Sequence, residues 1–281
     1  MAVCVSEPVA GTRVPSTLVA INPAPAASQF YSQTPELQQS IAPATPRLAA
    51  NSAWSATQRA VAATYNRLGN LFRRLAAIVN IPIAAALAVW FVESSGRPFT
   101  PDRALLRFEV GKFLAIWGHA NPAGFDAHFQ CGGHNGVGGE AWQNHAFRLA
   151  DAQSFAPVHT NSASEYAALQ LAQKLSSPEV ALRCASIGGC QILLSNYSML
   201  GYASATNMFD AFQHGENAHV LGFFDFCARQ LAPRTGELLT YLRNQDFVSF
   251  AHFYNGGGEV SAYAAKLKSA AADAAVVLAT R

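Results

Sequence analysis

The sequence of 281 residues has few charged side chains and no cluster of one charge sign. Only 13% of the residues are charged, and 19 Lys and Arg against 17 Asp and Glu leave a formal net charge of +2. A protein that follows a nucleic acid needs several clustered basic contacts, because phosphate neutralisation supplies much of its affinity. The sequence offers no such cluster, and we therefore expect no nucleic-acid partner.

Cysteine is also scarce, and its spacing follows no disulfide framework. Five cysteines are an odd number, in a chain that is too long to depend on disulfides for its stability. We therefore expect mostly buried thiols. The cysteines are Cys4, Cys131, Cys184, Cys190 and Cys227.

The sequence lacks a conventional signal peptide and a long uninterrupted apolar run. Its first residues contain no basic segment followed by a continuous apolar stretch. The longest apolar run, residues 75–92, includes Asn80 and Pro82, and the proline ends a helix there. About ten residues remain after it, too few to cross roughly 30 Å of hydrocarbon. We expect a buried helix and no membrane span.

Two regions differ in composition. Residues 1–52 are rich in Ala, Pro, Ser, Thr and Gln without a sustained apolar period, and such a segment buries too little to offset its ordering entropy. We interpret it as a flexible or partner-bound N-terminal arm. The 51% hydrophobic content of the chain suits one well-buried domain over residues 53–281.

Most of that domain has apolar residues at helical spacing. Two helices are expected on either side of Pro82, and one begins at Ser162, where Ser-Ala-Ser-Glu suggests a capping box closed by Glu165. Residues 104–113 fit either a strand or a helix, and residues 118–161, rich in Gly, His and Asn, resemble a long ordered loop. Further helices are predicted from Ser177-Pro178 and over 207–213, 217–231, 237–243, 246–254 and 259–279.

The stretch AVWFVESSGRPF, residues 88–99, ends an apolar helix on one carboxylate, Glu93. The partial negative charge at a helix C-terminus and burial beside Trp90 both disfavour the ionised carboxylate. Both effects would raise the pKa of Glu93, as a general acid requires. The alternative is an exposed glutamate at a helix end, near Arg97.

Two later stretches complete an ordered set. CASIGGCQILL, residues 184–194, carries Gly-x-x-Gln-Ile, and HFYNGGG, residues 252–258, carries Tyr-Asn-Gly. With the Glu-Ser pair before them, these elements resemble the lysozyme superfamily. More closely, residues 65–270 are similar to the N-acetylmuramidase family of phage endolysins and related bacterial cell-wall hydrolases.

The resemblance implies a mainly α (α+β) fold: a lysozyme-like bilobal helical domain with a small strand region and a cleft between the lobes. It also implies that Glu93 is the catalytic acid, and that Ser186, Gln191, Tyr254 and Asn255 line the glycan cleft. Amides can hydrogen-bond sugar hydroxyl and acetamido groups, and the Tyr254 ring offers a flat apolar face for a pyranose.

Most glycosidases need a second carboxylate, as nucleophile or as base for water. Glu109, in RFEV beside Arg107, is the first candidate, and Asp102, nine positions after Glu93, is the alternative. In a third arrangement the acetamido group of the substrate or a positioned water replaces the second carboxylate. For Glu109 a structural salt bridge with Arg107 or Lys112 also remains open.

Histidines offer a rival chemistry, because several lie in the Gly-rich stretch with one cysteine. Thiolate and imidazole are common zinc ligands, but their spacing here matches no established zinc pattern. We therefore expect no metal and no cofactor. The residues are His119, His128, Cys131, His134 and His145.

The resemblance implies a peptidoglycan hydrolase with lysozyme activity that cleaves the β-1,4 bond between N-acetylmuramic acid and N-acetylglucosamine in the bacterial cell wall. Without a signal peptide, such a protein would stay in the cytoplasm until released, or be carried on a particle. One alternative is a lytic transglycosylase of the same fold. Another is a non-catalytic structural or glycan-binding component of a virion or secretion machine, which the arm would join to its partner.

Overall fold

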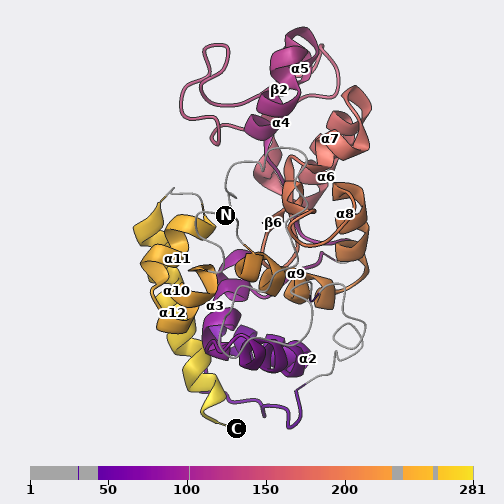
Figure 1. Cartoon of the computed structure of the whole chain (residues 1–281). Helices are drawn as coiled ribbons and strands as arrows, with labels where there is room; N and C mark the ends of the chain where they lie inside the picture. The colour runs from indigo at the N-terminus through magenta and orange to yellow at the C-terminus, as the bar shows by residue number, and fades with distance from the viewer. Residues whose placement is uncertain (1–30, 32–43, 101, 230–236, 256–258, 281) are drawn as a thin grey trace.

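The computed structural model describes residues 31, 44–100, 102–229, 237–255 and 259–280. This part of the chain contains eleven α-helices, α2 to α12, and six short strands. The predicted mainly α, lysozyme-like fold with a small strand region is confirmed. Figure 1 shows one end of the molecule built of long helices and the other end built of short helices, strands and loops.

The helical end is centred on the apolar helix α3. It packs between α2 and α12, and its residues from Ala85 to Trp90 are all buried. The helices of this end are α2 (Ala56–Ile78), α3 (Ile83–Ser94), α9 (Glu216–Arg229), α10 (Glu237–Asn244), α11 (Phe247–Tyr254) and α12 (Val260–Leu278).

The sequence accounts for both ends of α3. Pro82 is its N-cap residue, as the predicted helix break requires, and Ser95 ends it in the left-handed conformation with φ 51°. Gly96 continues with φ 72°, a value that glycine adopts without steric cost. The expected buried helix is confirmed. Among the described residues, no helix is long and apolar enough to span a membrane.

The other end contains two small antiparallel sheets. In the first, β1 pairs with β5 and β5 with β6, so that Arg107 lies opposite Ser186. The strands are β1 (Leu106–Phe108), β5 (Ala185–Ile187) and β6 (Ile192–Leu193), and, in the second sheet, β2 (Phe129–Gln130), β3 (Ala146–Phe147) and β4 (Ala156–Pro157).

Short helices surround these sheets. The ambiguous segment 104–113 forms β1 and then enters α4, and Pro178 begins α7 with Ser177 as its N-cap, as predicted. The helices are α4 (Val110–Ile116), α5 (Pro122–His128), α6 (Ser162–Leu175), α7 (Pro178–Leu182) and α8 (Ala205–His214), with 3₁₀ turns η2 (Gly118–Ala120), η3 (Val158–Thr160) and η4 (Leu194–Asn196).

Two predictions for this end need correction. Residues 118–161 are not one loop, because they contain α5 and the second sheet, held by the buried rings of Phe125, Phe129 and Phe147. Three isolated aromatic residues are too few to produce a periodic pattern. The N-cap of α6 is Asn161, which exchanges hydrogen bonds with Ser164, so the capping box lies one residue earlier than predicted and leaves Glu165 free for another role.

Part of the predicted N-terminal arm packs on the domain. Ala44 and Leu48 are buried, and both are hydrogen-bonded to Asn66 of α2. The backbone N–H of Tyr31, also buried, donates to Asp225 of α9 at 2.7 Å. Packing contacts therefore extend across the expected boundary at residue 52. Residues 1–30 and 32–43, to which the rest of that prediction applies, lie outside the described residues.

Candidate functional site

A small cleft of about 220 Å³ lies between the end of α3 and strand β1. It brings together groups from four separate parts of the chain: α3, the β1 segment, α6 and the turn before β6. Two of its groups are carboxylates, one is a guanidinium and one is an amide. The lining residues are Glu93, Leu105, Leu106, Arg107, Glu165 and Gln191.

Glu93 enters this cleft from the last turn of α3 and is partly buried. The hydroxyl of Tyr263, on α12, donates a short hydrogen bond to its Oε1. Burial, and then the nearby charge of Glu93, raises the pKa of Tyr263 well above its ordinary value. The phenol therefore stays protonated at neutral pH and remains a donor. We call α3, α12 and the buried groups around Glu93 the helical wall.

The Gly-Gly of the CASIGGCQ stretch forms the turn between β5 and β6 and lies against the helical wall. A Cβ on Gly189 would lie 2.4 to 2.6 Å from ring atoms of Trp90, one turn before Glu93 in α3. Gly188 has φ +82° and lies against the ring of His219, whose Nδ1 accepts the N–H of Gly189 at 3.1 Å. Only glycine allows this approach. The turn is thereby fixed in position relative to Glu93.

Gln191, predicted to line the cleft, follows this turn with φ 47°. Its Nε2 donates to the carbonyl oxygens of Gly188 at 2.9 Å and Leu105 at 3.3 Å. Ser186, another predicted site residue, is buried and donates to Oε1 of Gln191 at 3.1 Å. The structure thus brings Gln191 to the cleft, while Ser186 holds its amide from behind.

The expectation for the ring of Tyr254 needs correction. The ring is fully buried, stacks on Phe250 with centroids 4.8 Å apart, and offers no face to a sugar. Its hydroxyl donates to the carbonyl oxygen of Cys190 at 2.8 Å, so Tyr254 supports the β5–β6 turn from within the core. Asn255 is the C-cap residue of α11. The glycines that follow, 256–258, lie outside the described residues.

Glu165 is the second carboxylate of the cleft, and the sequence analysis did not propose it. Its Oε2 accepts the backbone N–H of Phe108 at 2.8 Å, and its Oε1 lies 2.8 Å from Nδ1 of His159. A signal existed, because residues 165, 168, 169 and 172 form the buried face of α6. A carboxylate on an apolar helix face indicates a buried partner or a site. We call β1, α6 and the polar groups around Glu165 the strand wall.

The two predicted second carboxylates are not among the residues that line the cleft. Glu109 is buried at the start of α4, with Oε1 2.8 Å from Nε of Arg107 and Oε2 3.7 Å from Nδ1 of His145. Asp102 is exposed beside Arg103. The salt bridge between Glu109 and Arg107 that the sequence left open is present.

The histidine-rich segment separates into two groups. His134 pairs with Asp126 at 2.7 Å, and His128 contacts the carbonyl oxygen of Arg148 at 3.0 Å. His145 instead meets Glu109 and His159, and among the described residues these three form the one group whose side chains could jointly hold a metal ion.

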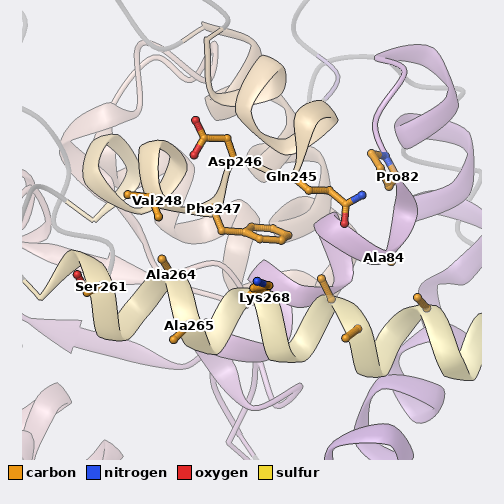
Figure 2. A pocket seen from close by; sticks show the side chains of 13 residues that line it. Pro82, Ala84, Gln245, Asp246, Phe247, Val248, Ser261, Ala264, Ala265 and Lys268 are labelled. Atoms are coloured by element: carbon orange, nitrogen blue, oxygen red, sulfur yellow. The ribbon is translucent and has the colours of Figure 1, made fainter.

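A second, larger cavity of about 710 Å³ lies along α12, away from Glu93. Figure 2 shows α12 along one side and residues Gln245 to Val248, at the start of α11, along the other. Its lining is largely alanine. Asp246 is its one carboxylate and is the N-cap of α11, where hydrogen bonds from Ser249 lower its pKa. This cavity offers little catalytic chemistry.

Comparisons with known proteins agree with the geometry of the cleft. The family model described as N-acetylmuramidase matches residues 82–275. A solved structure, that of the Burkholderia AP3 phage endolysin, is similar with a TM-score of 0.52 and 26% identity, over 73% of this chain and 70% of that one. No curated protein matches the chain. The family match covers more than half of the sequence and includes both walls of the cleft, and the chain therefore belongs to the N-acetylmuramidase family of peptidoglycan-degrading glycoside hydrolases.

Proposed function

We propose that this protein hydrolyses the β-1,4 bond between N-acetylmuramic acid and N-acetylglucosamine, with Glu93 as the general acid. The observation that carries the proposal is the position of Glu93 in a cleft whose opposite wall holds a second carboxylate, Glu165. A pair of carboxylates across a cleft is the arrangement that glycoside hydrolysis ordinarily requires. The similarity to a phage endolysin supports the bacterial cell wall as the place of action.

In this mechanism the carboxyl group of Glu93 gives its proton to the leaving glycosidic oxygen. Positive charge develops on the sugar ring as the bond breaks, and a fixed carboxylate stabilises it. Tyr263 holds one oxygen of Glu93, so the proton is carried on the other, Oε2. The carboxyl group is thereby oriented before substrate arrives.

Glu165 is our candidate for the second carboxylate, ahead of Glu109 and Asp102. It lines the same cleft as Glu93, and its two N–H donors suit an ionised carboxylate. It would serve as nucleophile or as base for water, and the anomeric form of the product distinguishes these roles. Arg107 and Gln191, also in the lining, would bind sugar hydroxyl, acetamido or carboxylate groups.

The decisive variant is Glu93→Gln, which keeps the shape of the side chain and removes its proton donor. We expect the rate of glycan release from purified peptidoglycan to fall by roughly 10²- to 10⁴-fold. Circular dichroism and thermal unfolding should be unchanged, since Gln can still accept the hydrogen bond from Tyr263. An undiminished rate would refute the role of Glu93.

Product analysis of the unaltered protein tests the reaction itself. Hydrolysis adds one water to each cleaved bond, and mass spectrometry of the released muropeptides would detect it. Anhydro products would instead indicate a lytic transglycosylase, and glycan binding without turnover would indicate a structural component. Reduction of the new ends with borohydride identifies which of the two sugars carries them.

A further inference from the structure

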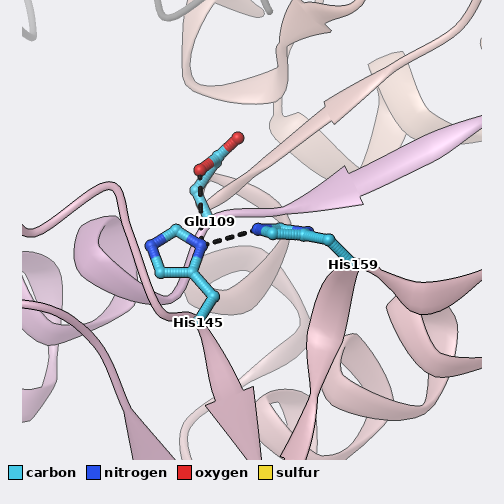
Figure 3. A group of neighbouring side chains, drawn as sticks. All are labelled: Glu109, His145 and His159. Carbon is cyan, nitrogen blue, oxygen red and sulfur yellow. Dashed lines mark hydrogen bonds and ion pairs between the residues drawn. The ribbon is translucent and has the colours of Figure 1, made fainter.

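Three side chains of the strand wall meet next to Glu165: Glu109, His145 and His159. Their potential ligand atoms all lie within 4.8 Å of one another. Figure 3 shows the ring of His145 between the other two. Its Nδ1 is 2.8 Å from Nε2 of His159 and 3.7 Å from Oε2 of Glu109.

The outer nitrogens of both rings face hydrogen-bond acceptors. Nε2 of His145 lies 2.9 Å from the carbonyl oxygen of Ala141, which can only accept, and Nδ1 of His159 lies 2.8 Å from Glu165. If both outer nitrogens donate, each neutral ring has its lone pair on the inner nitrogen. Two lone pairs then face each other across 2.8 Å, an arrangement that a cation between them would make favourable.

The competing tautomer is less well supported. In it Nε2 of His145 accepts the N–H of Gly111, but that contact is longer, at 3.3 Å, and the carbonyl of Ala141 then faces a lone pair at 2.9 Å. A proton as the shared cation would require a buried imidazolium. Burial lowers the pKa of His145, and this effect outweighs the opposing influence of Ala141 and Glu109.

We propose that Glu109, His145 and His159 bind a divalent first-row transition metal ion, with zinc as the expected occupant. Two imidazole nitrogens and one carboxylate oxygen form a ligand set that zinc accepts, with a fourth position left for water. Tetrahedral coordination needs the two nitrogens about 3.4 Å apart, so the rings would separate by roughly 0.5 Å on binding.

The surroundings of the three ligands fit a metal site. Metal-binding histidines ordinarily donate their other ring N–H to a carboxylate or a backbone carbonyl, as His159 does to Glu165 and His145 to Ala141. Arg107 occupies only Oε1 of Glu109 and leaves Oε2 facing the rings. The side chain of His159 is 24% exposed, which gives an ion a route of entry.

A bound ion would brace the strand wall from the side away from Glu93. It would join the start of α4, the segment before β3 and turn η3, and through His159 it would fix the orientation of Glu165. The proposal does not depend on the reaction, because metal binding is measured without substrate.

The test uses the full chain, freed of metal by dialysis against a chelator. Zinc is titrated in competition with a chromophoric chelator, and cobalt is titrated separately for its visible spectrum. We expect one ion per chain and a tetrahedral cobalt spectrum without the strong near-ultraviolet bands of thiolate ligands. His159→Gln should weaken zinc binding by on the order of 100-fold or more, and Glu165→Gln by roughly 10- to 100-fold.

His128→Gln is the matched control, since His128 lies in the same segment but contacts only the carbonyl of Arg148 among the ring contacts described. It should bind zinc as the unaltered chain does. Thermal unfolding of each metal-free variant verifies folding, and a folded His159→Gln with undiminished zinc affinity would overturn the proposal. So would the absence of stoichiometric binding of either ion, or a thiolate-type cobalt spectrum.

Discussion

The helical wall and the strand wall each present one carboxylate to the cleft, but in different surroundings. Glu93 has the hydroxyl of Tyr263 as a neighbour, and buried groups such as Tyr254 and Cys190 lie close enough to be affected by its charge. Glu165 has a backbone N–H and an imidazole. One wall is almost free of charged partners, whereas the other is built from them.

This difference assigns two roles to one residue type. A carboxyl group among apolar neighbours is suited to carry a proton, and a carboxylate held by N–H groups is suited to remain charged, as in other enzymes that use a pair of acids. The comparison also implies that the two walls should respond differently to mutation and to pH.

The largest expected effect concerns activity at the strand wall. Glu165→Gln should lower the rate of glycan release by on the order of 10²-fold or more, because the carboxylate facing Glu93 is lost. Asp102→Asn is the control, since Asp102 is exposed and outside the cleft lining. Equal rates for the two variants would mean that the walls do not share the chemistry.

Charge pairing should matter for the stability of the strand wall. Glu109→Gln leaves Arg107 without its carboxylate partner, and we expect a loss of about 3 kcal/mol in the free energy of unfolding, measured with chelator present. Glu216→Gln, which breaks an exposed pair with Arg67, should cost less than about 1 kcal/mol. Similar losses for both variants would contradict the comparison.

The helical wall should instead be sensitive to acid through His219. Burial lowers the pKa of His219 to about 4 from the ordinary value of 6.5. Between these values the unfolded chain binds a proton that the folded chain does not, so stability is complete above pH 6.5 and falls as the pH drops toward 4. The expected loss is about 3 kcal/mol.

Urea unfolding at several pH values measures this loss. His219→Phe should remove that part of the pH dependence, although its stability at neutral pH will be lower because Gly189 and Phe212 lose their hydrogen bonds to the ring. His252→Gln, at an exposed position on α11, should leave the dependence unchanged. A retained slope in His219→Phe would place the titrating group elsewhere.

The smallest expected effect is steric. Gly189→Ala forces a methyl group against the ring of Trp90 and should destabilise the protein by about 1 to 3 kcal/mol, with a fall in activity as the turn moves from Glu93. Gly138→Ala is the control, because a Cβ at Gly138 meets nothing within 4 Å. If both variants were neutral, the turn would not fix the position of the helical wall.

The sequence predicted most of the fold and one side of the cleft. Helix periodicity, the proline at residue 82 and the Ser177-Pro178 start gave the helices because those signals are local. The Gly-Gly turn was recognised as a motif, but its contact with Trp90 depends on residues about 100 positions apart and has no local signal.

The strand wall was harder to predict for the same reason. Glu165 was assigned to a helix cap, because Ser-Ala-Ser-Glu satisfies the capping pattern one residue out of register with the real one. The exposure of Tyr254 was inferred from its residue type, whereas packing of α11 buries it. The meeting of His145 with His159 results from the folding of a Gly-rich segment that carries little periodicity.

The contacts of α2 have a practical consequence for anyone who shortens this protein or transfers it to a fusion. The family match begins at residue 82, but Phe72 of α2 lies edge-on against Trp90, and Ala44 and Leu48 cover α2 in turn. A fragment limited to 82–275 would expose the apolar face of α3 to water. The region that identifies the family is therefore smaller than the unit that folds, and a shortened chain should begin before residue 44.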